Sequence, residues 1–295
     1  MPELPEISLY VDALRRHVVG HPLRRIRIAS PFLLRTWDPP ASELNGRTIT
    51  GISRIGKRIV LELEDDLFAV IHLMIAGRLR WKEAGVKIPR KFGHAAFDFD
   101  HGSLLFTEAG TTRRASLHVV RGRESLGQFD RGGIEPLEIT LEQFADRLRL
   151  ENRTLKRALT DPRLFSGIGN AHSDEILLDA KLSPITLTSR LDDEAIERLY
   201  DATRASLREW IDILLEETGD EFPDRVTAFH PRMKVHGRHG QPCPVCGSPI
   251  QRIAYANNET NYCARCQTGG RVLADRALSR LLKDDFPRTL EELEG

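Results

Sequence analysis

The chain has 295 residues with 43 basic and 43 acidic side chains, so its formal charge is zero. This length allows two domains with their own cores. No apolar run approaches the roughly 18 residues of a membrane helix and no basic-then-apolar leader is present, so we expect a soluble, cytoplasmic protein. Basic residues nevertheless outnumber acidic ones in 1–130 and 231–283, on either side of an acidic segment, and such basic segments can bind phosphates.

The chain begins MPELPE, and this terminus can supply a catalytic group. A methionine before a small residue is normally removed, which would leave Pro2 as a free secondary amine. Because α-amino groups titrate near ~7.7–8.0, such an amine can attack a sugar aldehyde carbon without the burial that a lysine needs. Glu3 and Glu6 place carboxylates beside it for acid–base chemistry. The six residues alone are equally compatible with an ordinary polar terminus.

An amphipathic helix is expected over residues 5–18, with strands over about 24–120. The strand candidates are short, rich in β-branched or aromatic residues, and separated by turns: Arg58–Glu64, Leu67–Leu73, Ala95–Asp100 and Ser103–Thr107. Helical periods then recur over four segments: Leu141–Leu150, Thr154–Leu164, Ala171–Ala180 and Asp192 to about Glu217. Residues 218–240 have loop composition, and a short helix over Leu273–Leu282 is expected before an acidic tail.

One helix followed by a run of strands and then by helices predicts an α+β protein. Residues 1–131 are expected to form an N-terminal domain with a helix and an antiparallel β-sandwich. A helical domain over 132–230, a ribbon over 231–283 and an acidic tail over 284–295 follow.

All four cysteines occur as two C-x2-C pairs with sixteen residues between the pairs. Each pair can place two thiolates on a tight turn, and two pairs complete a tetrahedral zinc site. The sequence therefore predicts one structural zinc ion per chain, with four ligands: Cys243, Cys246, Cys263 and Cys266. A redox-active dithiol pair and unrelated free thiols are the alternatives.

The segment Gly167-Ile-Gly169-Asn170 lies between two predicted helices. Glycines allow close approach of the backbone, and amides at the start of a helix can bind a phosphate, to which Asn170 adds a side-chain donor. A plain helix–helix turn is the alternative. Taken singly, Lys57, Arg113 and Arg114 are typical of solvated surface residues, and His72 is typical of a core histidine.

These motifs together resemble the formamidopyrimidine-DNA glycosylase/endonuclease VIII family in order and spacing, from residue 2 to about residue 283. The resemblance implies a bifunctional DNA glycosylase and AP lyase with a helix–two-turn–helix motif and a zinc finger. It implies that Pro2 forms a Schiff base, that Glu3 is its acid–base partner, and that Lys57 is a catalytic, DNA-contacting lysine. Damaged DNA is then the partner, bound at the nucleoid by a monomer that removes oxidised bases and nicks the strand by β-elimination, with or without δ-elimination.

The resemblance also suggests further DNA contacts, with Asn170 as the family's phosphate-binding asparagine and Lys156 as another phosphate contact. The full set of suggested contacts is Glu6, Met74, Ile75, Arg113, Arg114, Lys156, Gly169, Asn170, Arg252, Asn258 and Arg271.

Three sites depart from the family's 8-oxoguanine enzymes. Met74-Ile75 stands where they usually have Gly-Met, and Ala115-Ser116 stands where they have Phe-Gly, which removes an aromatic wedge. Asn258 occupies the place of the zinc-finger arginine, for which Arg252, Arg265 and Arg271 are candidate replacements. Because a strand alternates its faces, Met74 should point the wrong way to substitute. We therefore expect poor excision of 8-oxoguanine from duplex DNA, and better activity on single-stranded, abasic or destabilised sites.

Two other functions stay open. A non-catalytic binder of abasic or distorted DNA could have the same fold, although the intact Pro2, Glu3 and Lys57 argue against it. A zinc-ribbon nuclease would hold a divalent metal on two carboxylates, and the sequence shows no acidic cluster placed to do so.

Overall fold

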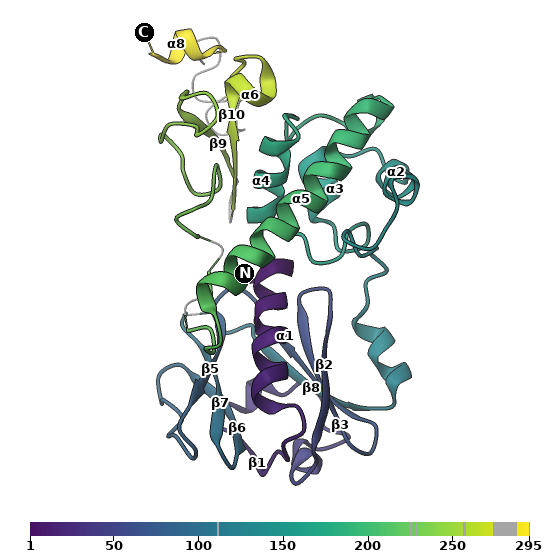
Figure 1. Cartoon of the computed structure of the whole chain (residues 1–295), viewed down its shortest axis with the longest axis vertical. Coiled ribbons are helices and arrows are strands. Elements are labelled where there is room, and N and C mark those ends of the chain that lie inside the picture. The colour runs from purple at the N-terminus through teal and green to yellow at the C-terminus, as the bar shows by residue number, and fades with distance from the viewer. Residues whose placement is uncertain (111, 225, 228, 256–257, 274–287, 295) are drawn as a thin grey trace. The chain divides into compact units, whose positions relative to one another are not determined.

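The structure is a computed structural model that describes residues 1–110, 112–224, 226–227, 229–255, 258–273 and 288–294 (Figure 1). The chain divides into two compact units. The first contains Met1–Arg131 and Trp210–Ala228, and the second contains Gly132–Glu209 and Phe229–Gly295. One long helix, α5 (Asp193–Thr218), contributes residues to both units. Among the described residues, no helix combines the length and apolar character needed to cross a bilayer.

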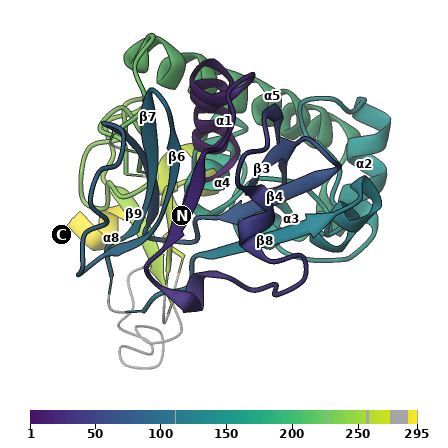
Figure 2. The ribbon, with the colours of Figure 1, turned by 90° about the horizontal axis from the view of Figure 1, so that it is seen from below.

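The first unit is a β-sandwich of two antiparallel four-stranded sheets, ordered β1-β6-β7-β5 and β2-β3-β4-β8. Figure 2 shows β6 and β7 on one side and β3, β4 and β8 on the other. The strands are β1 (Arg25–Ile28), β2 (Ile49–Ile55), β3 (Arg58–Leu63), β4 (Leu67–His72), β5 (Gly77–Lys82), β6 (Gly93–Phe99), β7 (Gly102–Glu108) and β8 (Ser116–Arg121).

Helix α1 (Leu4–Val18) packs into the sandwich along the apolar face that its sequence predicts. Ile7, Tyr10 and Leu14 recur at helical spacing and are fully buried, because residues three or four apart share one face of a helix. They join inward-facing strand residues such as Phe97 and Phe106 in one core. Each such side chain contributes roughly 1.5–3 kcal/mol through its burial, so the start of α1 is held on a stable support.

The strand registers define one end of this sandwich. In the second sheet, Arg58 pairs with His72 and His72 with Ser116. Short connections from β4 to β5 and from β7 to β8 join the two sheets there. We call this end the loop end; the described residues that leave the sandwich there include 29–33, 56–57, 73–76, 109–110 and 112–115.

The second unit is helical and carries a small ribbon. Its helices are α2 (Leu141–Arg149), α3 (Leu155–Thr160), α4 (Asn170–Asp179), the first part of α5, α6 (Ala264–Thr268) and α8 (Leu290–Glu294). Strands β9 (Ile250–Ala254) and β10 (Glu259–Cys263) form the antiparallel ribbon. Thr140 accepts a hydrogen bond from Gln143 and so caps α2.

The predicted α+β class, with a helix and β-sandwich followed by helices and a zinc-finger ribbon, is confirmed. Two details differ. The helix predicted over Thr154–Leu164 ends at Thr160, because Pro162 disfavours the helical conformation at Asp161. The helix predicted over Leu273–Leu282 lies outside the described residues, except for its first residue.

Candidate functional site

Residues 2–6 lie buried at the start of α1, whereas Met1 is exposed. Pro2 is buried, and Glu3 and Glu6 expose only 3% and 1% of their surfaces. The backbone N–H of Glu3 donates to the Glu6 carboxylate at 2.7 Å, within a capping box that fixes the first turn. The structure therefore gives Glu6, suggested above as a DNA contact, a role in the fold of the terminus.

The terminal amine lies in an electrostatic setting that favours its neutral form. Burial lowers the pKa of the Met1 ammonium below its ordinary value, the charges of Arg78 and Lys57 act in the same direction, and Glu3 and Glu6 oppose them. The amine belongs to Met1 in the full sequence, and Pro2 is the next residue. Only a neutral amine is nucleophilic, so this setting suits nucleophilic chemistry at the terminus.

Lys57 and Arg78 reach this terminus from the loop end. Lys57 follows Gly56, which occupies the left-handed region with φ 57° in the tight turn between β2 and β3. Arg78 lies at the start of β5 and donates to the carbonyl oxygens of Ile75 and Gly77 at 3.1 and 2.6 Å. Arg78 could not be singled out from the sequence, because nothing in its local context separates it from other strand arginines.

His72 is a half-buried histidine at the loop end, beside positively charged side chains. Burial lowers its pKa to about 4, and Arg58 and Lys57 contribute further. It is therefore neutral at physiological pH. His72 ends β4 and is not fully enclosed, so it lies at the margin of the core.

Residues 73–76 form a turn, which overturns the strand argument made for Met74. Met74 adopts φ 53°, a left-handed conformation that is uncommon for a non-glycine residue. Ile75 is at the exposed part of this turn, with 64% of its surface accessible. The direction of Met74 is therefore set by the turn, and Ile75 is the apolar side chain that this segment presents to solvent.

The segment before β8 is tied down by a buried carboxylate. Glu108 accepts hydrogen bonds from the backbone N–H groups of Arg114 and Ala115 at 2.9 and 3.2 Å. Its other oxygen lies 2.8 Å from His94 Nε2, and both side chains are at most 2% exposed. Arg113 and Arg114 are exposed, whereas Ala115 is only 3% exposed. Ala115 therefore offers no stacking surface.

Lys156 and Asn170 meet in the second unit, at the start of α4. The ammonium of Lys156 donates to the carbonyl oxygen of Asn170 and to the Asp174 carboxylate, both at 2.5 Å. Its side chain is only 11% exposed. The structure thus places Lys156 beneath Asn170, in an internal ion pair. The suggested direct phosphate contact does not match this position.

Asp174 and the neighbouring Glu175 connect α4 to the chain around the ribbon. Asp174 also accepts from His236 Nδ1 at 2.8 Å and from the backbone N–H of Asn261 at 3.1 Å. Glu175 accepts from three backbone N–H groups, those of residues 234–236. The Asn170 side-chain amide donates to the Glu259 carbonyl at 2.9 Å. We call Lys156, Asp174 and His236 the Asp174 network; sequence reasoning missed Asp174 and His236.

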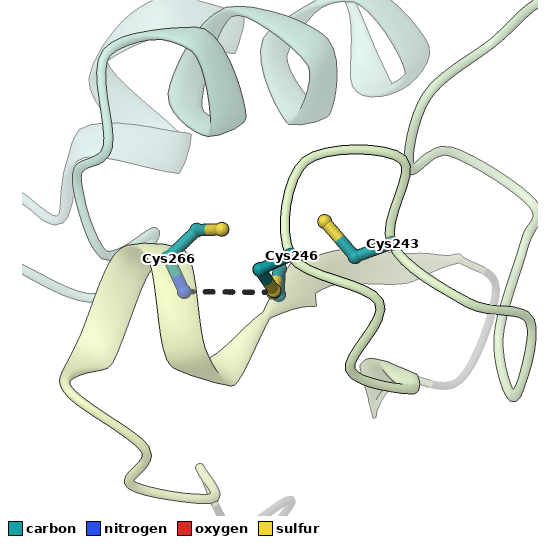
Figure 3. A group of neighbouring side chains, drawn as sticks. Cys243, Cys246 and Cys266 are labelled. Carbon is teal, nitrogen blue, oxygen red and sulfur yellow. Dashed lines mark hydrogen bonds between the residues drawn. The ribbon is translucent and has the colours of Figure 1, made fainter.

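The four cysteines come together as the spacing predicts. Their sulfur atoms all lie within 4.8 Å of one another, and Figure 3 shows Cys243, Cys246 and Cys266 directed toward a common point. Burial, together with the neighbouring thiols, raises the pKa of Cys263 to about 11. Four crowded sulfurs need a cation to be stable as thiolates, and a closed tetrahedral sulfur set suits zinc.

The ribbon also carries the suggested DNA contacts of the C-terminal part. Arg252, Asn258 and Arg271 are exposed, as is Arg265. Arg252 lies on β9 and pairs with Glu259 on β10 at 3.5 Å, and Asn258 lies just before β10. These positions leave several arginines accessible around the hairpin.

Three family models match successive parts of the chain. They are the formamidopyrimidine-DNA glycosylase N-terminal domain over residues 1–114, the H2TH domain of the same glycosylase over 133–219, and the zinc finger found in FPG and IleRS over 240–269. With the geometry of the four cysteines, the last match establishes zinc as the structural cofactor.

Relatives along almost the whole chain have the same name. The formamidopyrimidine-DNA glycosylases of Solibacter usitatus and Desulforamulus reducens are 33% and 32% identical, over 90% of this chain and 99% of theirs. The Lactococcus lactis FPG (MutM) in complex with DNA containing an oxidised pyrimidine matches with a TM-score of 0.81 and 28% identity, over 90% of this chain and 100% of that one. The same enzyme with abasic-site DNA matches with a TM-score of 0.79, at 27% identity over 90% and 99% of the two chains. The chain belongs to the formamidopyrimidine-DNA glycosylase family.

Proposed function

We propose that this protein is a base-excision-repair DNA glycosylase with AP lyase activity, acting through a Schiff base on Pro2 once Met1 is removed. The observation that carries the proposal is the partly buried terminal amine, whose neutral form is favoured beside Glu3 and Lys57. Relatives of the same family that bind abasic or oxidised DNA support the choice of substrate.

The proposed reaction begins with a nucleotide rotated out of the stack, at a cost of a few kcal/mol. The lone pair of the Pro2 nitrogen forms a bond to C1′ while the bond from C1′ to the base breaks. The bonding electrons leave with the base, which takes a proton from the acid–base partner, Glu3. The bond from C1′ to O4′ then breaks, O4′ takes the proton that the Pro2 nitrogen loses, and an iminium ion forms between Pro2 and C1′.

This iminium acidifies the proton on C2′ and so prepares strand cleavage. A base removes that proton, the electrons form the C1′–C2′ enamine and then the C2′–C3′ double bond, and the 3′ phosphate leaves. A second elimination can release the 5′ phosphate, and water hydrolyses the iminium to return the free Pro2 amine. No electron acceptor is consumed, so the reaction steps balance without a redox cofactor.

DNA contacts would come from basic and amide groups in each unit. At the loop end, Lys57 is half-buried beside the terminus and Arg113 and Arg114 are exposed. In the second unit, Asn170 lies at the start of α4, where backbone N–H groups favour phosphate. Phosphate contacts of this kind fix the position of DNA without reading its sequence.

We further propose that 8-oxoguanine in duplex DNA is a poor substrate. Filling the space left by an extruded base usually needs an inserted side chain. Ala115 is small and 3% exposed, and its N–H is held by Glu108. Single-stranded, abasic or destabilised sites need less unstacking and should be better substrates.

Trapping with borohydride tests the catalytic proposal. The protein with Met1 removed is incubated with abasic-site DNA and borohydride, and the covalent adduct is mapped by peptide mass. We expect the adduct on Pro2, and no adduct in a matched protein that retains Met1 or has an N-terminal tag. Tight binding of abasic DNA with neither adduct nor strand cleavage would favour a non-catalytic binder, and an adduct on Lys57 would contradict the role of Pro2.

A further inference from the structure

An exposed phenylalanine lies in a short turn at the loop end. Phe32 is 79% exposed, in the 3-10 turn η1 (Pro31–Leu33) that follows β1. The turn itself is anchored, because the N–H groups of Ala29 and Ser30 donate to the His94 carbonyl at 2.8 and 3.1 Å. On its other side Leu33 is fully buried. The backbone around Phe32 is therefore fixed while its ring faces solvent.

The strand registers place this turn on the same edge of the molecule as the candidate catalytic terminus. Leu34 pairs in parallel with Leu117, one residue after Ser116, which itself pairs with His72. His72 in turn pairs with Arg58, the residue after Lys57. Three strand spacings separate the Lys57 turn from the Phe32 turn, a distance of about 14 Å across the sheet. Both turns thus open on one face within the first unit.

The surroundings of Phe32 are basic. Arg35 is exposed three residues later, and Arg113 and Arg114 are exposed before β8, the strand beside the 34–36 segment. Arg113 donates to the backbone carbonyl of Lys91, which is also exposed. One buried pair, His94 and Glu108, anchors both the segment before Phe32 and the segment of the two arginines.

An aromatic ring among arginines fits a nucleobase better than an apolar protein surface. Aromatic and arginine side chains are also enriched in protein interfaces, but lysine is depleted there, and the exposed Lys91 lies in this group. Sites for unpaired DNA combine basic groups of both kinds with aromatic rings on which bases stack. At this end of the sandwich Ala115 offers no ring, and Ile75 has no π face.

We infer that Phe32 is a base-stacking residue whose ring binds the face of an unpaired base in single-stranded or abasic-site DNA. The inference rests on the proposed function for its DNA substrate. It deepens that function by giving the enzyme a sequence-tolerant contact with bases that are already out of the helix.

Binding to a non-cleavable probe tests the inference. The probe is an oligonucleotide with a tetrahydrofuran abasic analogue, used single-stranded and as a duplex, and affinity is measured by fluorescence anisotropy. Phe32→Ala should weaken binding of the single-stranded probe roughly tenfold or more, and should change binding of undamaged duplex little. Phe32→Trp should restore affinity, since it restores an aromatic face.

Trp37 provides a matched control on the same segment. It is 86% exposed and follows Thr36, whose hydroxyl accepts from the Val119 N–H at 2.7 Å, so it lies farther along β8 from the loop end. Trp37→Ala should leave the affinity unchanged. Both substituted side chains are exposed, so neither change should unfold the protein.

Two results would overturn the inference: wild-type affinity of Phe32→Ala for the single-stranded probe, or equal losses for Phe32→Ala and Trp37→Ala. Borohydride trapping of the wild-type protein, run in parallel, separates failure of the stacking inference from failure of the proposed function. If the wild-type protein forms no adduct but Phe32→Ala specifically loses affinity for the single-stranded probe, catalysis is rejected and stacking is supported. If the wild-type protein forms an adduct and Phe32→Ala keeps its affinity, stacking alone is rejected.

Discussion

Replacing Asp174 with asparagine should destabilise the second unit strongly. The Asp174 side chain is fully buried and pairs with Lys156 at 2.5 Å and with His236 at 2.8 Å. Asparagine keeps the size but removes the charge, which leaves the Lys156 ammonium buried without its counter-ion. Breaking a buried pair in this way costs about 3–5 kcal/mol. For a folded unit of this size, that lowers the melting temperature by roughly 6–20 °C.

A double-mutant cycle measures this coupling. Lys156→Met removes the stranded charge, so the double variant Lys156→Met/Asp174→Asn should lose about 1–3 kcal/mol less than the sum of the two single losses. Thermal unfolding gives the stabilities, and the rate of zinc release to a chelator reports on the second unit alone. Because Lys156 also donates to the Asn170 carbonyl, Lys156→Met should weaken DNA binding as well.

Asp193 is the control for this experiment. It pairs with Arg149 at 2.6 Å, but its side chain is 96% exposed, so Asp193→Asn should cost at most about 1 kcal/mol. Additive losses in the cycle, or an Asp174→Asn variant no less stable than Asp193→Asn, would refute the reasoning.

Three further predictions concern the terminus, the zinc site and acid stability. Glu3→Gln should slow base excision by roughly 10²–10⁴-fold, the range for a general acid or base, and should slow cleavage of a preformed abasic site less. Glu6→Gln retains an acceptor for the Glu3 N–H and should leave most activity. Equal effects of the two changes would count against the role assigned to Glu3. Cys263→Ser should reduce bound zinc from one ion per chain to nearly none and weaken DNA binding, whereas zinc retained at full occupancy in elemental analysis would contradict the four-sulfur site. The pKa of His72 is lowered from 6.5 to about 4, so between these pH values the unfolded chain takes up a proton that the folded chain does not. The free energy of unfolding should therefore fall as the pH drops from 6.5 toward 4. His72→Gln should flatten this fall, as measured by thermal melting at several pH values.

The zinc ligands and the start of α1 could be predicted because their signals are local. Two C-x2-C pairs need only a hairpin to bring four sulfurs together, and the sulfurs lie within 4.8 Å of one another. The β-branched and aromatic residues of β3 and β4, bounded by turn residues, predicted those strands to within one residue. In both cases the contacts join residues that are close in the sequence, so the local sequence is enough to predict them.

The partners of the site could not be predicted because they are distant in the chain. Arg78 acts on a terminus more than seventy residues away, and Asp174 meets His236 across 62 residues. Neither residue stands in a motif, and each becomes recognisable only once strands and helices are packed. Met74 shows a different limit, because a strand pattern does not reveal where the turn begins.

Glu108 in the first unit and Asp174 in the second solve one physical problem in the same way. Segments that face DNA must be polar and accessible, so they bury little apolar surface of their own to offset the entropy lost on ordering them. A buried carboxylate that accepts several N–H groups supplies the missing stabilisation, since charge-assisted hydrogen bonds are stronger than neutral ones. Glu108 does this for the N–H groups of Arg114 and Ala115, and Asp174 for the ammonium under Asn170. The groups proposed to contact DNA would thereby be positioned before DNA arrives, and binding energy would not be consumed in ordering them.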